Sequence, residues 1–152
     1  MKEYINNSFD IKRRPLAEWE KQCAVQLTWP HKDSDWDYCL DDVIRNFVEL
    51  AHTIIRFEKL IIVTEDEQLT RTQLGADTDF SQITFFTIPS NDTWARDHNV
   101  LSVDDNGRKK VINFVFNGWG MKFASNKDNQ IAPNLKAQNC FAEDVEFVNS
   151  RI

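Results

Sequence analysis

Residues 90–98 place an aromatic ring beside charged and hydrogen-bonding groups, in a polar stretch between two apolar runs. Trp94 and Asp97 lie three positions apart within it. A guanidinium cation is flat and permanently charged. Its forked donors suit a carboxylate, and its face stacks on aromatic rings, with tryptophan the strongest partner. The pair therefore predicts a site for a planar cation. The spacing equally fits a packed ring beside a turn-capping aspartate, and both interpretations stay open at this point.

The remaining reactive side chains are mostly expected to have structural roles. Arg96 is expected to form an ion pair with a neighbouring strand, and His98 to begin a strand as a base or a packed ring. The scattered cysteines Cys23, Cys39 and Cys140 lack the spacing of a zinc site or a disulfide framework. They are expected to be inert thiols in a reducing cytoplasm, and neither a metal nor a cofactor is expected.

The composition bounds the class of protein. The chain has 152 residues, 41% of them hydrophobic and 28% charged, with a net charge of -6. Such an acidic chain is a poor nucleic-acid binder, although it suits a cationic ligand. There is no apolar run long enough for a membrane span and no signal-peptide core at the N-terminus, so no membrane partner is expected.

The first half of the chain predicts a strand–helix–strand unit. Residues 23–29 alternate as a half-buried strand, and apolar residues at three- and four-residue intervals predict a helix over about residues 36–57, capped by Asp35 or Asp37. The apolar run at 60–63 is typical of a parallel strand covered on both faces.

Further elements precede and follow the polar stretch. Residues 64–75 predict a second helix, and residues 82–88 a third strand that leads into the stretch. An Asn-Gly pair at 106–107 predicts a hairpin between runs 100–103 and 110–116.

The C-terminal part is less regular. Gly118 and Gly120 bracket Trp119, which indicates positive φ angles or close backbone approach. Residues 124–139 are expected to be a polar loop and residues 145–148 a strand. The chain is thus expected to be one α/β domain, 1–152, with mixed strands. Residues 1–22 are expected to form an N-terminal arm in which Arg13-Arg14-Pro15 interrupts regular structure.

Four segments together resemble the agmatine deiminase family, which includes bacterial peptidylarginine deiminases of the Porphyromonas type. They are Ala17-Glu18-Trp19-Glu20, Thr28-Trp29-Pro30-His31, Asn91-Asp92-Thr93-Trp94-Ala95-Arg96-Asp97 and Phe116-Asn117-Gly118-Trp119-Gly120-Met121-Lys122-Phe123. The last is similar to the family pattern F-N-x-W-G-G-K-[FY].

The resemblance implies a five-bladed α/β propeller, of which this chain would hold about two ββαβ-type modules. It also implies cofactor-free hydrolysis of a guanidinium to a ureido group with loss of ammonia, through a cysteine thiouronium intermediate and a histidine proton shuttle. Asp97 then takes the role of the guanidinium-binding catalytic carboxylate, and Trp94 lines the substrate slot. Asn117 and Trp119 are carried over as substrate-pocket wall or scaffold.

The chain departs from the family pattern in several places. The His-x-Asp motif and the glycine-rich segment ending in His-Cys have no match here, and Cys140 lies in a different context. Asn99 and Met121 occupy glycine positions of the pattern, and Asn99 is expected to tolerate a positive φ.

These observations favour the N-terminal, guanidinium-binding part of a deiminase-like hydrolase, inactive alone, whose substrate is agmatine or an arginyl peptide. The alternative is a non-catalytic truncated remnant that acts as a binding or assembly module. Exposed strand edges in a partial propeller also predict self-association into a homo-oligomer.

Overall fold

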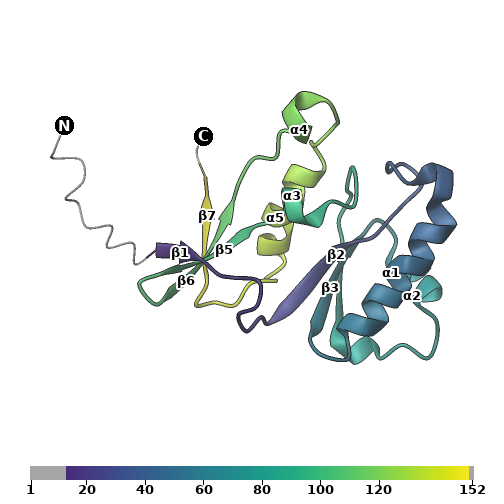
Figure 1. Cartoon of the computed structure of the whole chain (residues 1–152), viewed down its shortest axis with the longest axis horizontal. Coiled ribbons are helices and arrows are strands. Elements are labelled where there is room, and N and C mark those ends of the chain that lie inside the picture. The colour runs from purple at the N-terminus through teal and green to yellow at the C-terminus, as the bar shows by residue number, and fades with distance from the viewer. Residues whose placement is uncertain (1–12, 151–152) are drawn as a thin grey trace, which may run out of the picture.

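The computed structural model describes residues 13–150, which form two β-sheets with helices packed on them (Figure 1). None of the helices in this range is both long enough and apolar enough to cross a bilayer. In chain order, the elements are β1 (Arg13–Pro15), β2 (Ala24–Thr28), η1 (Asp37–Cys39), α1 (Leu40–Ile54), β3 (Lys59–Thr64), α2 (Glu67–Leu74), η2 (Phe80–Gln82), β4 (Ile83–Thr87), α3 (Ala95–His98), β5 (Leu101–Asp105), β6 (Arg108–Asn113), α4 (Gly118–Met121), α5 (Asp128–Ala137) and β7 (Glu146–Asn149).

The first sheet is parallel and has the strand order β2-β3-β4. The predicted strand–helix–strand unit is therefore confirmed as β2, α1 and β3. Helix α1 is shorter than predicted, because a 3-10 turn takes up residues Asp37–Cys39 ahead of it. The predicted aspartate cap is wrong: neither that turn nor α1 has a side-chain cap, whereas α2 is capped by Asp66.

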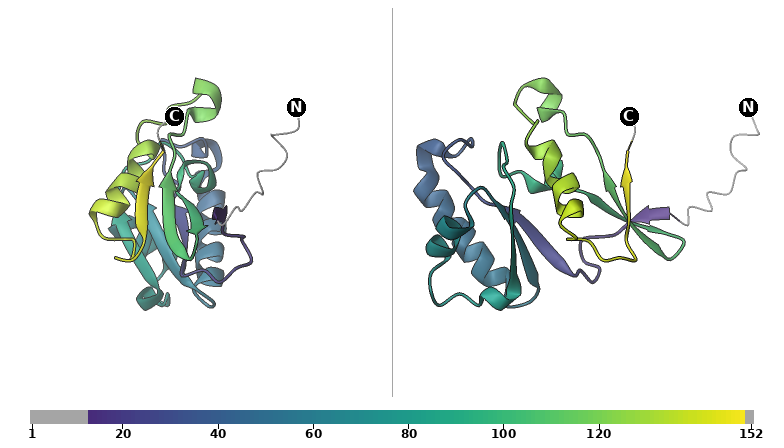
Figure 2. Two further views of the ribbon diagram at one scale, coloured as in Figure 1. Left: turned by 90° about the vertical axis from the view of Figure 1, so that its left-hand side faces the viewer. Right: turned by 180° about the vertical axis from the view of Figure 1, so that it is seen from behind.

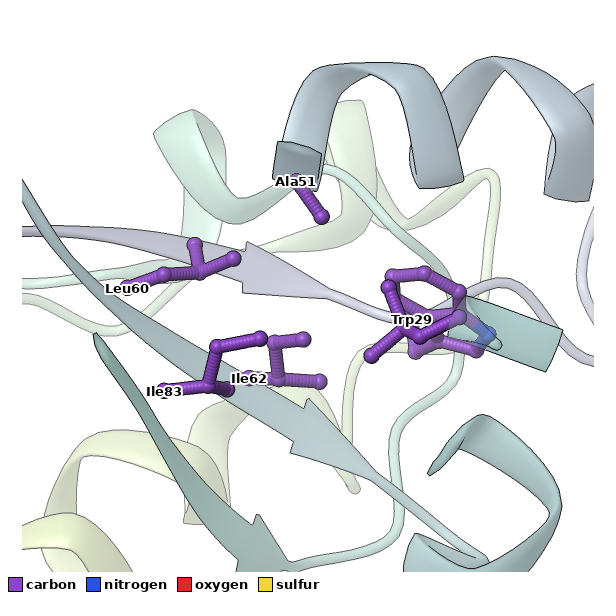
Figure 3. Packing of buried hydrophobic residues seen from close by; sticks show 6 residues of the cluster. Trp29, Ala51, Leu60, Ile62 and Ile83 are labelled. Carbon is purple, nitrogen blue, oxygen red and sulfur yellow. The ribbon is translucent and has the colours of Figure 1, made fainter. Parts of the chain in front are cut away.

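Both faces of this sheet are buried. On one face α1 and α2 cover a cluster that contains Trp29, Leu60 and Ile62, each at most 3% exposed (Figure 3). On the other face Val63 and Phe86 pack with residues of α5. The prediction that residues 60–63 are covered on both sides is confirmed. For the same reason the half-buried interpretation of residues 23–29 is wrong at Thr28, which is fully buried on the supposed outer face.

The second sheet has the order β1-β5-β6-β7. The Asn-Gly hairpin is confirmed: β5 and β6 pair antiparallel, and Asn106 and Gly107 both have positive φ angles, as a tight hairpin turn requires. The strand predicted at 145–148 is β7, which pairs parallel to β6.

Two regions differ from the sequence predictions. Arg13-Arg14-Pro15 does not interrupt regular structure, because it forms β1 at the edge of the second sheet. Proline is tolerated at an edge, and an ion pair from Arg13 to Asp105 (3.0 Å) ties the strand to β5. The first twelve residues of the predicted arm lie outside the described part.

The loop predicted at 124–139 is instead largely helix α5, although Pro133 lies inside it. Ile131, Ala132 and Leu135 are each at most 1% exposed and give this polar segment one apolar side. The helix lies between the two sheets (Figure 2). Tertiary packing outweighs the weak local signal here. The mixed α/β class is confirmed, while the single domain and the propeller arrangement stay predictions.

Candidate functional site

The polar stretch leaves the parallel sheet at the carboxyl end of β4. Because β2, β3 and β4 run parallel, the segments that follow them meet at one edge of the sheet, where ligand sites of α/β folds commonly lie. His31, Glu65 and Ser90 all follow these strands, and the ring of His31 lies 3.1 Å from the hydroxyl of Ser90. The stretch is not wholly a loop, since Ala95–His98 forms the short helix α3.

A reciprocal pair of side chains fixes this stretch to α5. The Asn91 side-chain oxygen accepts from the backbone N–H groups of Lys127 (2.7 Å) and Asp128 (3.2 Å). In return, the Asp128 carboxylate accepts from the backbone N–H groups of Asn91 (2.6 Å) and Asp92 (3.3 Å). Asp128 is 2% exposed, so these bonds satisfy a buried carboxylate. The Asn91–Asp128 clamp therefore sets where the following residues lie.

Trp94 presents an exposed ring with a fixed orientation. It is 39% exposed, and its indole N–H donates to Oδ2 of Asp92 (3.0 Å). Trp36 and Trp119 flank it, with ring centroids at 5.6 Å and 5.9 Å. Trp36 is fixed in turn by donating to the Thr93 hydroxyl (2.8 Å). The three rings form an aromatic cluster at the surface.

Trp119 reaches this cluster from an unusual backbone segment. Gly118, Trp119, Gly120 and Met121 all have positive φ angles, which confirms the prediction made from the two glycines. The Asn117 side chain accepts from the N–H of Gly120 (3.0 Å) and closes the turn. Trp119 makes edge-to-face contacts with Phe116 and Phe123 as well as with Trp94.

Asp97 lies one turn beyond Trp94, and its backbone N–H donates to the carbonyl of Trp94 (2.9 Å). Asp97 is exposed, and within residues 13–150 its carboxylate has no hydrogen-bond or ion-pair partner. It is thus available for a ligand. The adjacent Arg96 forms an ion pair with Glu18, which lies in a turn and not in the predicted strand.

Sequence reasoning missed the buried carboxylate of Asp92, which is 8% exposed. Burial raises its pKa, and the nearby carboxylate of Asp35 adds to this effect. Its oxygens accept from the Trp94 indole and from the Thr93 N–H (2.7 Å). Only its place two residues before a tryptophan could have drawn attention to it.

His98 does not begin a strand, because it is the last residue of α3. It is 2% exposed, and neither ring nitrogen has a hydrogen-bond partner within the described residues. Burial lowers the pKa of its imidazole, opposed by the charges of Asp128 and Asp97. A neutral ring is therefore favoured. Asn99, after it, has an extended backbone with φ -86°, so this position does not need the tolerance of a positive φ that was expected of asparagine.

Two further groups bear on metal and thiol chemistry. His31, Asp33 and Glu65 bring one ligand-type atom each within 4.8 Å of one another. Both nitrogens of His31 already have partners, and Lys127 pairs with Glu65 (3.3 Å), so the group is explained without an ion. Burial raises the pKa of the Cys140 thiol, which favours the unreactive protonated form.

Comparison with known proteins places this geometry in a class. Two solved structures share the fold: one assigned as an arginine deiminase from Porphyromonas gingivalis, with 47% identity and a TM-score of 0.81, and C. jejuni agmatine deiminase with substrate bound, with 27% identity and a TM-score of 0.79. They cover 90% and 92% of this chain respectively. The class is therefore that of the deiminase fold.

The family follows from sequence. The model of the Porphyromonas-type peptidyl-arginine deiminase family matches residues 14–150, and the chain belongs to this family. A protein from Shewanella sp. (strain W3-18-1) assigned as an agmatine deiminase is 30% identical over 132 residues, which is 83% of this chain. The chain spans 35% of that relative's length and 40% of each of the two solved chains.

Proposed function

We propose that this chain supplies the guanidinium-binding part of a hydrolase that converts a guanidinium group to a ureido group, as in agmatine and peptidylarginine deiminases. The observation that carries the proposal is the exposed carboxylate of Asp97, one turn after the exposed ring of Trp94, in a chain of this family. Asp97 would accept the forked N–H groups of the cation, and Trp94 would stack on its flat face.

The surroundings support this division of roles. Trp36 and Trp119 both pack against Trp94, so little rotamer freedom is lost when a ligand stacks on the ring. Asn117 shapes the turn that presents Trp119. The partner implied is a small guanidino compound such as agmatine, or an arginyl side chain of a peptide.

The covalent chemistry of the whole protein needs an activated thiol. In the proposed reaction a cysteine attacks the guanidinium carbon, ammonia leaves, and water then releases the ureido product and restores the thiol. Cys140 has a raised pKa and a half-buried thiol, which makes it a poor nucleophile. The part proposed for this chain is therefore to bind and orient the substrate.

Substitution of the proposed anion tests this function. Asp97→Asn removes the charge but little volume, and a hydrogen bond to a charged group contributes about 1.5–3 kcal/mol, so agmatine affinity should fall roughly ten- to a hundredfold. Titration followed by tryptophan fluorescence or calorimetry measures the change. Asp77→Asn is the matched control, because Asp77 is also exposed but lies in the loop after α2. Equal affinity of both variants would overturn the proposal.

A further inference from the structure

The hydrogen bond from the Trp94 indole N–H to Asp92 has no role in the function proposed above. Its acceptor, Asp92, is 8% exposed, whereas the ring itself is 39% exposed. One carboxylate oxygen accepts from the Trp94 indole (3.0 Å), and the other accepts from the backbone N–H of Thr93 (2.7 Å). A buried carboxylate therefore lies at the N–H edge of a partly exposed ring.

Two other tryptophans show that a charged acceptor is not needed to hold an indole. Trp29 donates to the side-chain amide of Gln73 (2.7 Å), and Trp36 donates to the hydroxyl of Thr93 (2.8 Å). Both acceptors are neutral and both bonds are short. A neutral amide or hydroxyl acceptor for the indole N–H would thus be enough to orient the Trp94 ring.

Retaining a carboxylate here has a cost. Burial disfavours its ionised form, and Asp35 nearby adds like-charge repulsion, so the pKa of Asp92 is raised. The Thr93 N–H and the Trp94 indole favour the ionised form and oppose these effects. A carboxylate whose burial disfavours its ionised form is a candidate for a functional role.

A hydrogen bond from the indole N–H to an anion changes how strongly the face of the ring attracts a cation. A cation is attracted by the negative quadrupole of the indole. An N–H donated to an anion polarises the donor, since hydrogen-bonded groups polarise one another in a low-dielectric interior. Electron density shifts into the ring, and its exposed face then binds a cation more tightly. A neutral ligand gains much less.

We propose that Asp92 is a positioning residue that orients Trp94 and, by its charge, makes the ring select a guanidinium cation over a neutral ureido group. The inference rests on the proposed function and deepens it. Substrate and product of the proposed reaction differ in this charge, so the ring holds the substrate and lets the product leave.

A matched pair of ligands separates charge from structure. Agmatine and its ureido counterpart, carbamoylputrescine, share the same ammonium end and differ only at the guanidinium. In Asp92→Asn, agmatine affinity should fall about three- to tenfold, the scale of one cation–π contact, while carbamoylputrescine affinity should change less than about twofold. An equal loss for both ligands would show a structural role only and overturn the inference.

The neighbouring indole provides the control variant. Thr93→Val removes the neutral acceptor of Trp36 and should leave the ratio of the two affinities unchanged. Circular dichroism and thermal unfolding establish that each variant is folded. If Asp97→Asn binds agmatine normally, the proposed function itself fails. If it binds weakly while Asp92→Asn keeps the unmodified affinity ratio, only the role of Asp92 fails.

A second variant keeps the inference testable if Asp92→Asn does not fold. The carboxylates that face Asp92 are Asp35, from the segment before η1, and Asp128, whose side chain accepts from the Asp92 N–H. Asp35 is exposed, and Asp35→Asn removes like charge, so Asp92 should stay ionised to lower pH. The preference for agmatine over carbamoylputrescine should then persist to lower pH than in the unmodified chain. An unchanged pH profile would overturn the inference.

Discussion

The clusters around Trp29 and Trp94 use the same side chain in opposite ways. Trp29 is 3% exposed, meets Phe47 edge-on and donates to a neutral amide. Trp94 is 39% exposed, lies between two other indoles and donates to a carboxylate. The first cluster rests on regular strands and helices, whereas the second is held by a short helix and a turn of left-handed residues.

The difference separates a region that stabilises the fold from a region that lowers its stability. Burial of the first cluster removes aliphatic and aromatic surface from water, which stabilises the fold. The second cluster leaves large rings exposed and keeps residues such as Trp119 in a costly backbone conformation. Contiguous exposed apolar surface is typical of a binding site. Stability and binding should therefore respond to different substitutions.

The largest effect should come from the buried cluster. Leu60 is fully buried in β3, and Leu60→Ala should lower the free energy of unfolding by about 2–5 kcal/mol, because it removes transfer energy and leaves a cavity. The folded fraction should keep its agmatine affinity. Trp94→Ala should show the opposite balance: the loss of stability should be smaller, about 1–3 kcal/mol, because the buried Asp92 carboxylate loses one donor, while agmatine affinity should fall at least about tenfold. Urea unfolding measures the stability of both variants, and ligand titration measures their agmatine affinity. If each variant lost stability and affinity to the same degree, the two clusters would not have separate roles.

A smaller effect is expected in the turn that carries Trp119. A Cβ on Gly118 would lie 2.2 Å from the backbone oxygen of Phe123, and its φ is +59°. Gly118→Ala should cost about 1–3 kcal/mol and displace Trp119, which weakens agmatine binding. Met121 has φ +64° and is 88% exposed, so Met121→Gly should instead raise the melting temperature slightly by relieving strain. Thermal unfolding measures both, and effects of the same sign would refute this account of the turn.

The smallest effect concerns pH. The pKa of His98 is lowered in the folded chain, so below the unfolded value near 6.5 the unfolded state binds the extra proton and stability falls. The slope from one group is at most about 1.4 kcal/mol per pH unit. His98→Leu should flatten the stability profile below about pH 6.5, because within residues 13–150 neither ring nitrogen makes a bond that the change would break. Chemical unfolding at a series of pH values measures this. An unchanged slope would mean that His98 is not the group that titrates.

Much of the fold could be predicted from local patterns. The apolar run in β3, the periodicity of α1 and the Asn-Gly hairpin each reflect a rule that acts over a few residues. Helix α5 could not be predicted in this way, because its few apolar residues gain meaning only against Val63 and Phe86 of the parallel sheet. Strand β1 likewise depends on a partner strand some ninety residues away, as the Arg13–Asp105 separation of 92 shows.

The candidate site was predictable in part. Trp94 and Asp97 belong to one backbone turn, so their spacing was visible in the sequence, and the motif order supplied Asn117 and Trp119. The roles of all four residues stay predictions. Asp128 could not be identified, because the clamp joins residues 37 positions apart. For His98 the sequence left a base and a packed ring open, because burial of a histidine depends on the elements around it; the structure buries the ring. Sequence patterns indicate local chemistry but not which residues distant in the sequence are buried together.

The Asn91–Asp128 clamp also orders events in time. Asp128 leaves the ribosome after Trp94 and Asp97, so the nascent stretch has no partner for its backbone N–H groups until α5 has emerged and folded against the sheet. The parallel sheet and α1 can form before this step. The stretch that carries Trp94 thus reaches its final position after the parallel sheet can fold.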